Sequence, residues 1–231
     1  MKETYLEHLI TDKNVTLWNK IIDKDSVNIV LWDKPYSELF SNIYGSEIRM
    51  TSLDTDIFNH ELCHLYINQL FDGLYYSLKS RMPEELFNFV SGGCLQHMAN
   101  CLEHKLFFNL YQEIGGNPLS FTTDFKSKKG NNFHNQIKSL TLNYLDRYLG
   151  NLFSILGDCN DSISYNEELN KYKIISPEVF AASINLFEEI REIGIREQLE
   201  DFEIGDNGVV INKTHNNSSQ DFWEIVVKEF V

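Results

Sequence analysis

The chain has 231 residues, of which 42% are hydrophobic and 13% aromatic, enough apolar material for one large domain or two small ones. Acidic residues outnumber basic residues by 34 to 20, so the formal net charge is −14. Because nucleic acids and anionic membranes are bound largely through Lys and Arg, this balance argues against a dedicated binder of either.

The sequence also argues against export and membrane insertion. It has no apolar run of about 18 residues, the length that a membrane-spanning helix needs, and its N-terminus mixes charges where a signal peptide would be apolar. Its four cysteines form no CxxC pair, a pattern typical of reduced thiols. We therefore expect a cytoplasmic protein.

The first part of the chain predicts a short helix within residues 1–25 and then a small sheet. The β-branched, apolar segment 27–32 indicates a strand, which Lys34-Pro35 ends. A helical turn is expected at 37–43, and a second short strand at 47–50.

Two buried helices are expected next. The first begins at Asp54 or Thr55, residue types that cap helix N-termini, and ends near Gly73. Its apolar residues leave little of it exposed. The second, 94–114, is apolar nearly all round and ends at a glycine pair.

The rest of the chain predicts a loop at 117–132, helices at 133–156 and 177–193, and a hairpin near 205–211. The predicted fold class is therefore α+β and helix-dominated, with a small N-terminal sheet and the candidate site between two buried helices. A polar segment from 158 to 170 suggests a catalytic domain over 1–160 with a helical and hairpin extension over 161–231 packed on it, or else one continuous domain.

The segment His60-Glu61-Leu62-Cys63-His64 carries the clearest chemical signal. Histidines four apart on a helix project from one face, so both imidazoles can bind one Zn²⁺. Glu61 lies beside the open metal position, where it can take a proton from a zinc-activated water. Cys63 is expected to be a buried, small apolar side chain rather than a ligand.

This HExxH segment resembles the zincin metallopeptidases. The resemblance implies that His60 and His64 bind zinc, that Glu61 is the general base, and that the substrate is a peptide or protein. The metzincin subgroup would require Gly at 67 and His at 70, where this chain has Ile67 and Leu70.

A third zinc ligand is expected from the helix at 94–114, whose segment Asn100 to His104 looks like the second ligand helix of the gluzincins, although it lacks their usual NExxSD spacing. We favour Glu103, because a carboxylate in an apolar sector is costly unless it is paired or bound to metal. His104 would then stabilise a developing oxyanion, and it remains the alternative ligand. His97 is expected to be a core or capping residue.

The strand at 46–50 precedes the zinc helix, and by the same resemblance we assign it the edge that pairs with an extended substrate. Two other readings remain open. One is a non-catalytic metal-binding or partner-binding protein that keeps this helix pair. The other is a di-iron enzyme, which would need a second ExxH that the chain lacks.

Overall fold

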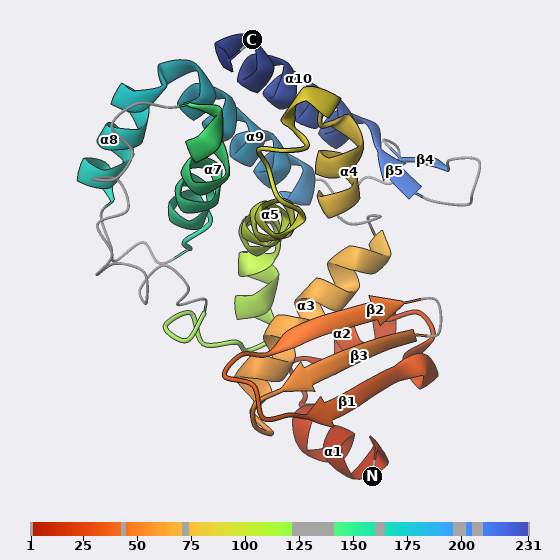
Figure 1. The fold of residues 1–231 in the computed structure, drawn as a ribbon. Helices are drawn as coiled ribbons and strands as arrows, with labels where there is room; N and C mark the ends of the chain where they lie inside the picture. Colours follow the sequence, from red (N-terminus) through yellow and green to blue (C-terminus); the bar gives the residue numbers. More distant parts are fainter. Residues whose placement is uncertain are drawn as a thin grey trace. The chain divides into compact units, whose positions relative to one another are not determined.

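The computed structural model describes residues 2–42, 45–70, 74–121, 141–159, 165–195, 202–204 and 210–230. The architecture is helix-dominated α+β, as predicted, with one three-stranded sheet near the N-terminus (Figure 1). The chain divides into two compact units. The first comprises residues 1–70 and 107–121, and the second comprises 71–106 and 122–231.

The sheet of the first unit has the order β1-β3-β2, formed by β1 (Val27–Leu31), β2 (Glu38–Asn42) and β3 (Gly45–Met50). β3 runs parallel to β1 and antiparallel to β2. The helical turn predicted at 37–43 is therefore wrong, because β2 folds back on β3 and pairs along its whole length. The two strands predicted at 27–32 and 47–50 are confirmed.

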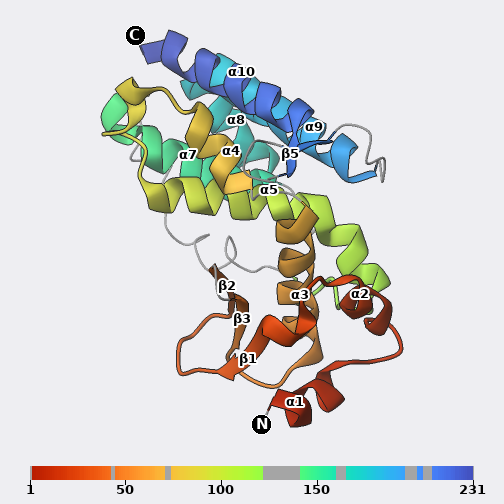
Figure 2. The same cartoon turned by 90° about the vertical axis from the view of Figure 1, so that its right-hand side faces the viewer.

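One face of this sheet is covered by helices. Ile48 and Met50 of β3 are fully buried on that face, while Glu47 and Arg49 alternate to the other. The covering helices are α1 (Lys2–Leu9), α2 (Val15–Lys20) and α3 (Thr55–Leu70), which Figure 2 shows together on one side of the sheet. The sheet thus provides a rigid support for α3.

Helix α3 begins where the sequence predicts. Asp54 is its N-cap, since the Asp54 carboxylate accepts hydrogen bonds from the backbone N–H groups of Asp56 (2.7 Å) and Ile57 (3.3 Å). The glycine expected to end it, Gly73, lies outside the described residues.

The second unit is a helical bundle around one hydrophobic core. Its helices are α4 (Leu74–Arg81), the part of α5 (Gly92–Glu113) up to Leu106, α7 (Leu142–Leu156), α8 (Asn166–Ile175), α9 (Pro177–Ile195) and α10 (Lys213–Phe230). Two short antiparallel strands, β4 (Phe202–Ile204) and β5 (Val210–Asn212), occupy the region of the predicted hairpin. All four cysteines of the chain are free thiols.

The compact units differ from the predicted domains, which placed a boundary near residue 160. Buried residues on both sides of that position share the core of the second unit, among them Leu78, Leu102, Leu149, Leu186 and Trp223. Described residues of α8, α9 and α10 therefore share this core with α4, α5 and α7.

Helices α4 and α8 were not predicted, because their sequences are short and rich in polar residues. The loop predicted at 117–132 and the helix predicted at 133–156 are only partly described, since residues 122–140 lie outside the described chain. Within the described ranges, no helix has both the length and the apolar character required to cross a bilayer.

Replacing the α3 N-cap should destabilise the protein measurably. We expect Asp54→Ala to lower the free energy of unfolding by about 1 kcal/mol, because two backbone N–H groups lose their acceptor. Urea denaturation followed by circular dichroism measures this loss. Ser52→Ala, also on the exposed turn before α3, is the control and should change stability by less than about 0.5 kcal/mol. Equal midpoints for the two variants would contradict the capping role.

Candidate metal centre

Helix α3 brings His60 and His64 side by side. Four residues along an α-helix leave two side chains on the same face, one turn apart. The ring centroids are 5.0 Å apart, and the two Nε2 atoms lie 3.2 Å apart within hydrogen-bonding distance. The two ligands predicted from the HExxH spacing are therefore adjacent.

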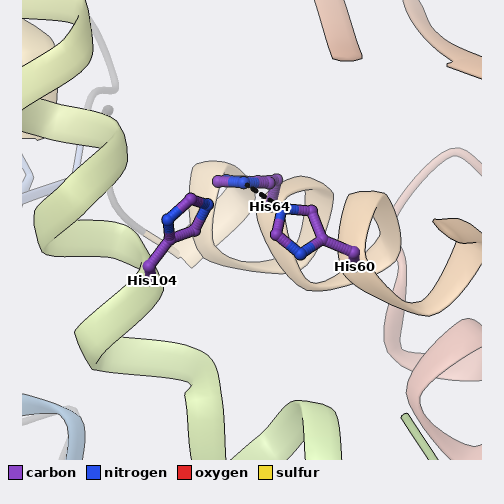
Figure 3. A group of neighbouring side chains, drawn as sticks. All are labelled: His60, His64 and His104. Atoms are coloured by element: carbon purple, nitrogen blue, oxygen red, sulfur yellow. Dashed lines mark hydrogen bonds between the residues drawn. The ribbon is translucent and has the colours of Figure 1, made fainter. Parts of the chain in front are cut away.

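His104 of α5 completes a group of three imidazoles (Figure 3). One nitrogen of each ring lies within 4.8 Å of the other two, so the three side chains could hold one metal ion. Helix α5 also brings Phe107 to the same place, three residues after His104. The Phe107 ring is 4.7 Å from His64 and 5.6 Å from His60, centroid to centroid. One face of α5 is therefore turned toward both histidines of α3.

Aromatic rings enclose His60. Besides Phe107, it contacts Phe121 at 5.1 Å and Tyr111 at 6.2 Å, and Phe121 itself packs on Tyr111 at 4.8 Å. Tyr111 is fixed in turn, because its hydroxyl donates a hydrogen bond to the backbone oxygen of Asn117. These contacts restrict the orientation of the His60 ring and lower the local polarity around it.

This environment keeps His60 neutral. Burial, and then the neighbouring His64, lower the pKa of His60 well below its ordinary value of 6.5. A neutral imidazole offers a nitrogen lone pair, which metal binding requires. In the hydrogen bond between the two facing Nε2 atoms, one nitrogen carries the proton and donates the bond, and the other accepts it. Binding of one ion by both Nε2 atoms would move that proton to the far side of its ring.

The spacing of His60 and His64 fits two ligands of a tetrahedral ion. Two nitrogens bound at the usual zinc distance of about 2.0–2.1 Å lie about 3.3–3.4 Å apart. The observed 3.2 Å between His60 and His64 is within a few tenths of an ångström of that value. With His104, the set amounts to three nitrogen ligands, the number common in catalytic zinc sites.

Glu61 and Cys63 occupy the same two turns of α3. Both are buried, with exposed fractions of 4% and 0%. Burial and the nearby Glu61 carboxylate raise the pKa of the Cys63 thiol, so it stays protonated and does not compete as a thiolate ligand. This agrees with the apolar packing role predicted for Cys63.

The structure places His104, and not Glu103, in the ligand group. Glu103 was predicted as the third ligand because a buried charge is costly unless it is paired or bound to metal. Glu103 is indeed buried, at 6% exposure. Neighbouring helix positions point about 100° apart, so only one of them can share the face that Phe107 presents to the histidines. His97 has the structural role expected of it, since its Nε2 lies 2.6 Å from the Ser154 hydroxyl of α7.

The substrate strand predicted at 46–50 is also wrong. β3 is the central strand, with β1 on one side and β2 on the other, so its backbone groups are already paired on both edges. Residues 37–43 were predicted as a helical turn, so the second pairing partner of β3, which is β2, was not expected.

The sequence analysis missed the aromatic enclosure of His60. Phe107 and Tyr111 follow His104 at intervals of three and seven, which is one face of a helix, and this spacing was a usable signal. Phe121 lies beyond the helix, and only its packing identifies it.

Comparison of the chain with protein-family models, with curated proteins and with solved structures finds no match.

The lowered pKa of His60 predicts a stability loss in acid for the metal-free protein. Below pH 6.5 the unfolded chain takes up a proton at His60 that the folded chain excludes, so unfolding is favoured as the pH falls. One such proton contributes at most about 1.4 kcal/mol per pH unit.

Urea denaturation of the metal-free protein between pH 7 and pH 5 measures this effect. The slope of stability against pH should be shallower for His60→Asn than for the wild type. His8→Asn, at an exposed position on α1, is the control and should keep the wild-type slope. Equal slopes for all three proteins would show that His60 is not held neutral.

Proposed function

We propose that the chain is a zinc-dependent hydrolase, and most specifically a peptidase of the zincin type. The observation that carries this proposal is the group of three imidazoles, two of which come from the HExxH segment of α3. The buried Glu61 of the same segment supplies the carboxylate that such a hydrolase requires. The resemblance to zincins supports the choice of peptides as substrates.

Zinc is the proposed metal because the three imidazoles are ligands of the kind that zinc prefers. Zn²⁺ accepts neutral imidazoles readily, and catalytic zinc sites combine three protein ligands with one open position. His60, His64 and His104 would hold the ion. When bound, zinc polarises a carbonyl and lowers the pKa of water toward neutrality, which is the chemistry that amide hydrolysis needs.

The residues of the chain take the following roles in this proposal. Glu61 accepts the proton of the attacking water and then passes it to the leaving amine. The aromatic wall of Phe107, Tyr111 and Phe121 holds the His60 ring in place and limits the access of bulk water on that side. Glu103 has no assigned part in the ligand set.

With β3 enclosed, the sheet keeps two edge strands, β1 and β2, and we assign the extended peptide to β2. It lies at an edge of the sheet and pairs with β3 alone within that sheet. An exposed strand edge offers backbone N–H and C=O groups to an added strand. Phe40 of β2, which is 42% exposed, would contact such a peptide.

The second candidate function is a non-catalytic metal site that stabilises the fold. The burial of the donors favours it, since His64 and His104 are only 6% and 5% exposed. A site of this kind would bind zinc and cleave no substrate.

Loss of a zinc ligand should weaken zinc binding much more than loss of the residue next to it. We expect His104→Ala to raise the zinc Kd roughly 100-fold, because one of three protein ligands is lost. Glu103→Ala, the neighbouring and equally buried position, should raise it by less than about fivefold. Competition titration with a chromophoric chelator gives both constants. If Glu103→Ala raised the zinc Kd more than His104→Ala did, Glu103 would be the ligand.

Replacement of Glu61 separates the two candidate functions. The hydrolase predicts that Glu61→Gln keeps its zinc and loses at least about 100-fold in the rate of peptide cleavage, because the general base is gone. Zinc content by plasma mass spectrometry and hydrolysis of a denatured, casein-like substrate are measured together. A zinc-loaded wild type that cleaves no substrate tested would favour the non-catalytic site.

A further inference from the structure

A buried amide network lies directly beside His60. Asn59 is 1% exposed and Asn14, in the turn before α2, is fully buried. The Asn14 side-chain amide donates to the Asn59 carbonyl oxygen at 2.7 Å, and the Asn59 amide donates to the backbone oxygen of Ile114 at 3.2 Å. All three residues belong to the first compact unit.

We infer that Asn59 is a positioning residue for the metal centre, one that fixes α5 against α3 so that the ligands meet. This inference rests on the proposed zinc site. Asn59 touches no ligand atom in this role, and it acts through the helix that carries His104.

The C-terminal end of α5 needs a hydrogen-bond partner from outside the helix. The last carbonyl groups of a helix have no partner within the helix, and Ile114 directly follows the last residue of α5. Asn59 satisfies the Ile114 carbonyl from the side of α3. The hydrogen bond therefore ties the C-terminal end of one ligand helix to the residue next to a ligand on the other.

His104, Phe107 and Ile114 lie on one continuous helical stretch, in which each residue advances the axis by about 1.5 Å. A slip of one residue would therefore move the His104 nitrogen by more than 1 Å and turn it by about 100°. Metal–ligand distances tolerate only about 0.2 Å. Fixing the end of α5 along its axis thus matters for the ligand distance.

The direction of the Asn59 amide depends on Asn14. The Asn59 carbonyl oxygen accepts from Asn14, whose own carbonyl oxygen accepts the backbone N–H of Thr11 at 2.7 Å. Asn14 also donates to the backbone oxygen of Leu9 at 2.8 Å. Because both the oxygen and the nitrogen of the Asn14 amide are held, its NH₂ group is the one that faces Asn59. The Asn59 oxygen accepts from it, so Asn59 presents its own NH₂ group to Ile114.

The test compares metal binding with stability in two variants of the full chain. Asn59→Ala removes the bond to Ile114. Leu17→Ala, at a buried apolar position in the same unit that makes none of these side-chain hydrogen bonds, should destabilise the fold and is the matched control. Co²⁺ serves as the probe, since its visible absorption reports the coordination geometry. Urea midpoints are measured alongside.

We expect Asn59→Ala to raise the Co²⁺ Kd roughly tenfold and to change the visible spectrum, as is typical when a residue that orients a metal ligand is lost. Leu17→Ala should lower the urea midpoint and keep the wild-type spectrum, with a Kd within about twofold of the wild type. If Asn59→Ala keeps the wild-type Kd and spectrum, or if Leu17→Ala changes them equally, the positioning role is overturned.

A measurement on the wild type keeps the inference testable if Asn59→Ala does not fold. Binding of metal and formation of the Asn59–Ile114 bond should reinforce each other, so the Asn59 side-chain NH₂ should exchange with solvent more slowly when zinc is present. Equal exchange with and without zinc would overturn the inference. Failure of the wild type to bind Co²⁺ or zinc at all would instead overturn the proposed function.

Discussion

The candidate site depends on the close approach of two imidazole nitrogens of α3, the Nε2 atoms of His60 and His64, which lie 3.2 Å apart. Such a pair tolerates neither two added protons nor free rotation, because the like charges would repel and the aromatic neighbours leave little room. The lowered pKa of His60 is the electrostatic result of that packing. A metal ion could meet both demands, since it would bind one nitrogen lone pair of each ring.

The support of this pair comes from ordinary folding forces. The sheet buries Ile48 and Met50 under the helices, the Asp54 cap starts α3 at a defined residue, and Asn59 joins α3 to the end of α5. None of these interactions involves a metal. The two histidines of α3 are therefore held in place by hydrogen bonds and apolar packing within the first compact unit.

The sequence predicted those parts of the site that depend on a single helix. The closeness of His60 and His64 and the packing role of Cys63 follow from the 3.6-residue period of α3, the Asp54 cap follows from its residue type, and the structure has each of them. It was harder to predict which of two adjacent residues on one helix faces the other helix. Glu103 and His104 differ by about 100° on α5, and burial, which both share, could not decide between them.

The wrong predictions have the same origin. β2 was taken as a helical turn, because its identity as a strand depends on pairing with β3, and this in turn concealed that β3 is central. The polar segment near 160 does not reveal that helices on either side of it share one hydrophobic core, because a polar connection carries no information about packing. Contacts between distant segments decided each of these points, and periodicity carries no information about them.

Anomalous diffraction at the zinc absorption edge, from crystals grown with zinc, locates a bound ion without ambiguity. If the three imidazoles bind zinc, one strong peak should lie within about 2.1 Å of a ring nitrogen of each of His60, His64 and His104. A zinc-loaded crystal with no peak there, or with a peak held by Glu103 in place of His104, would contradict this assignment.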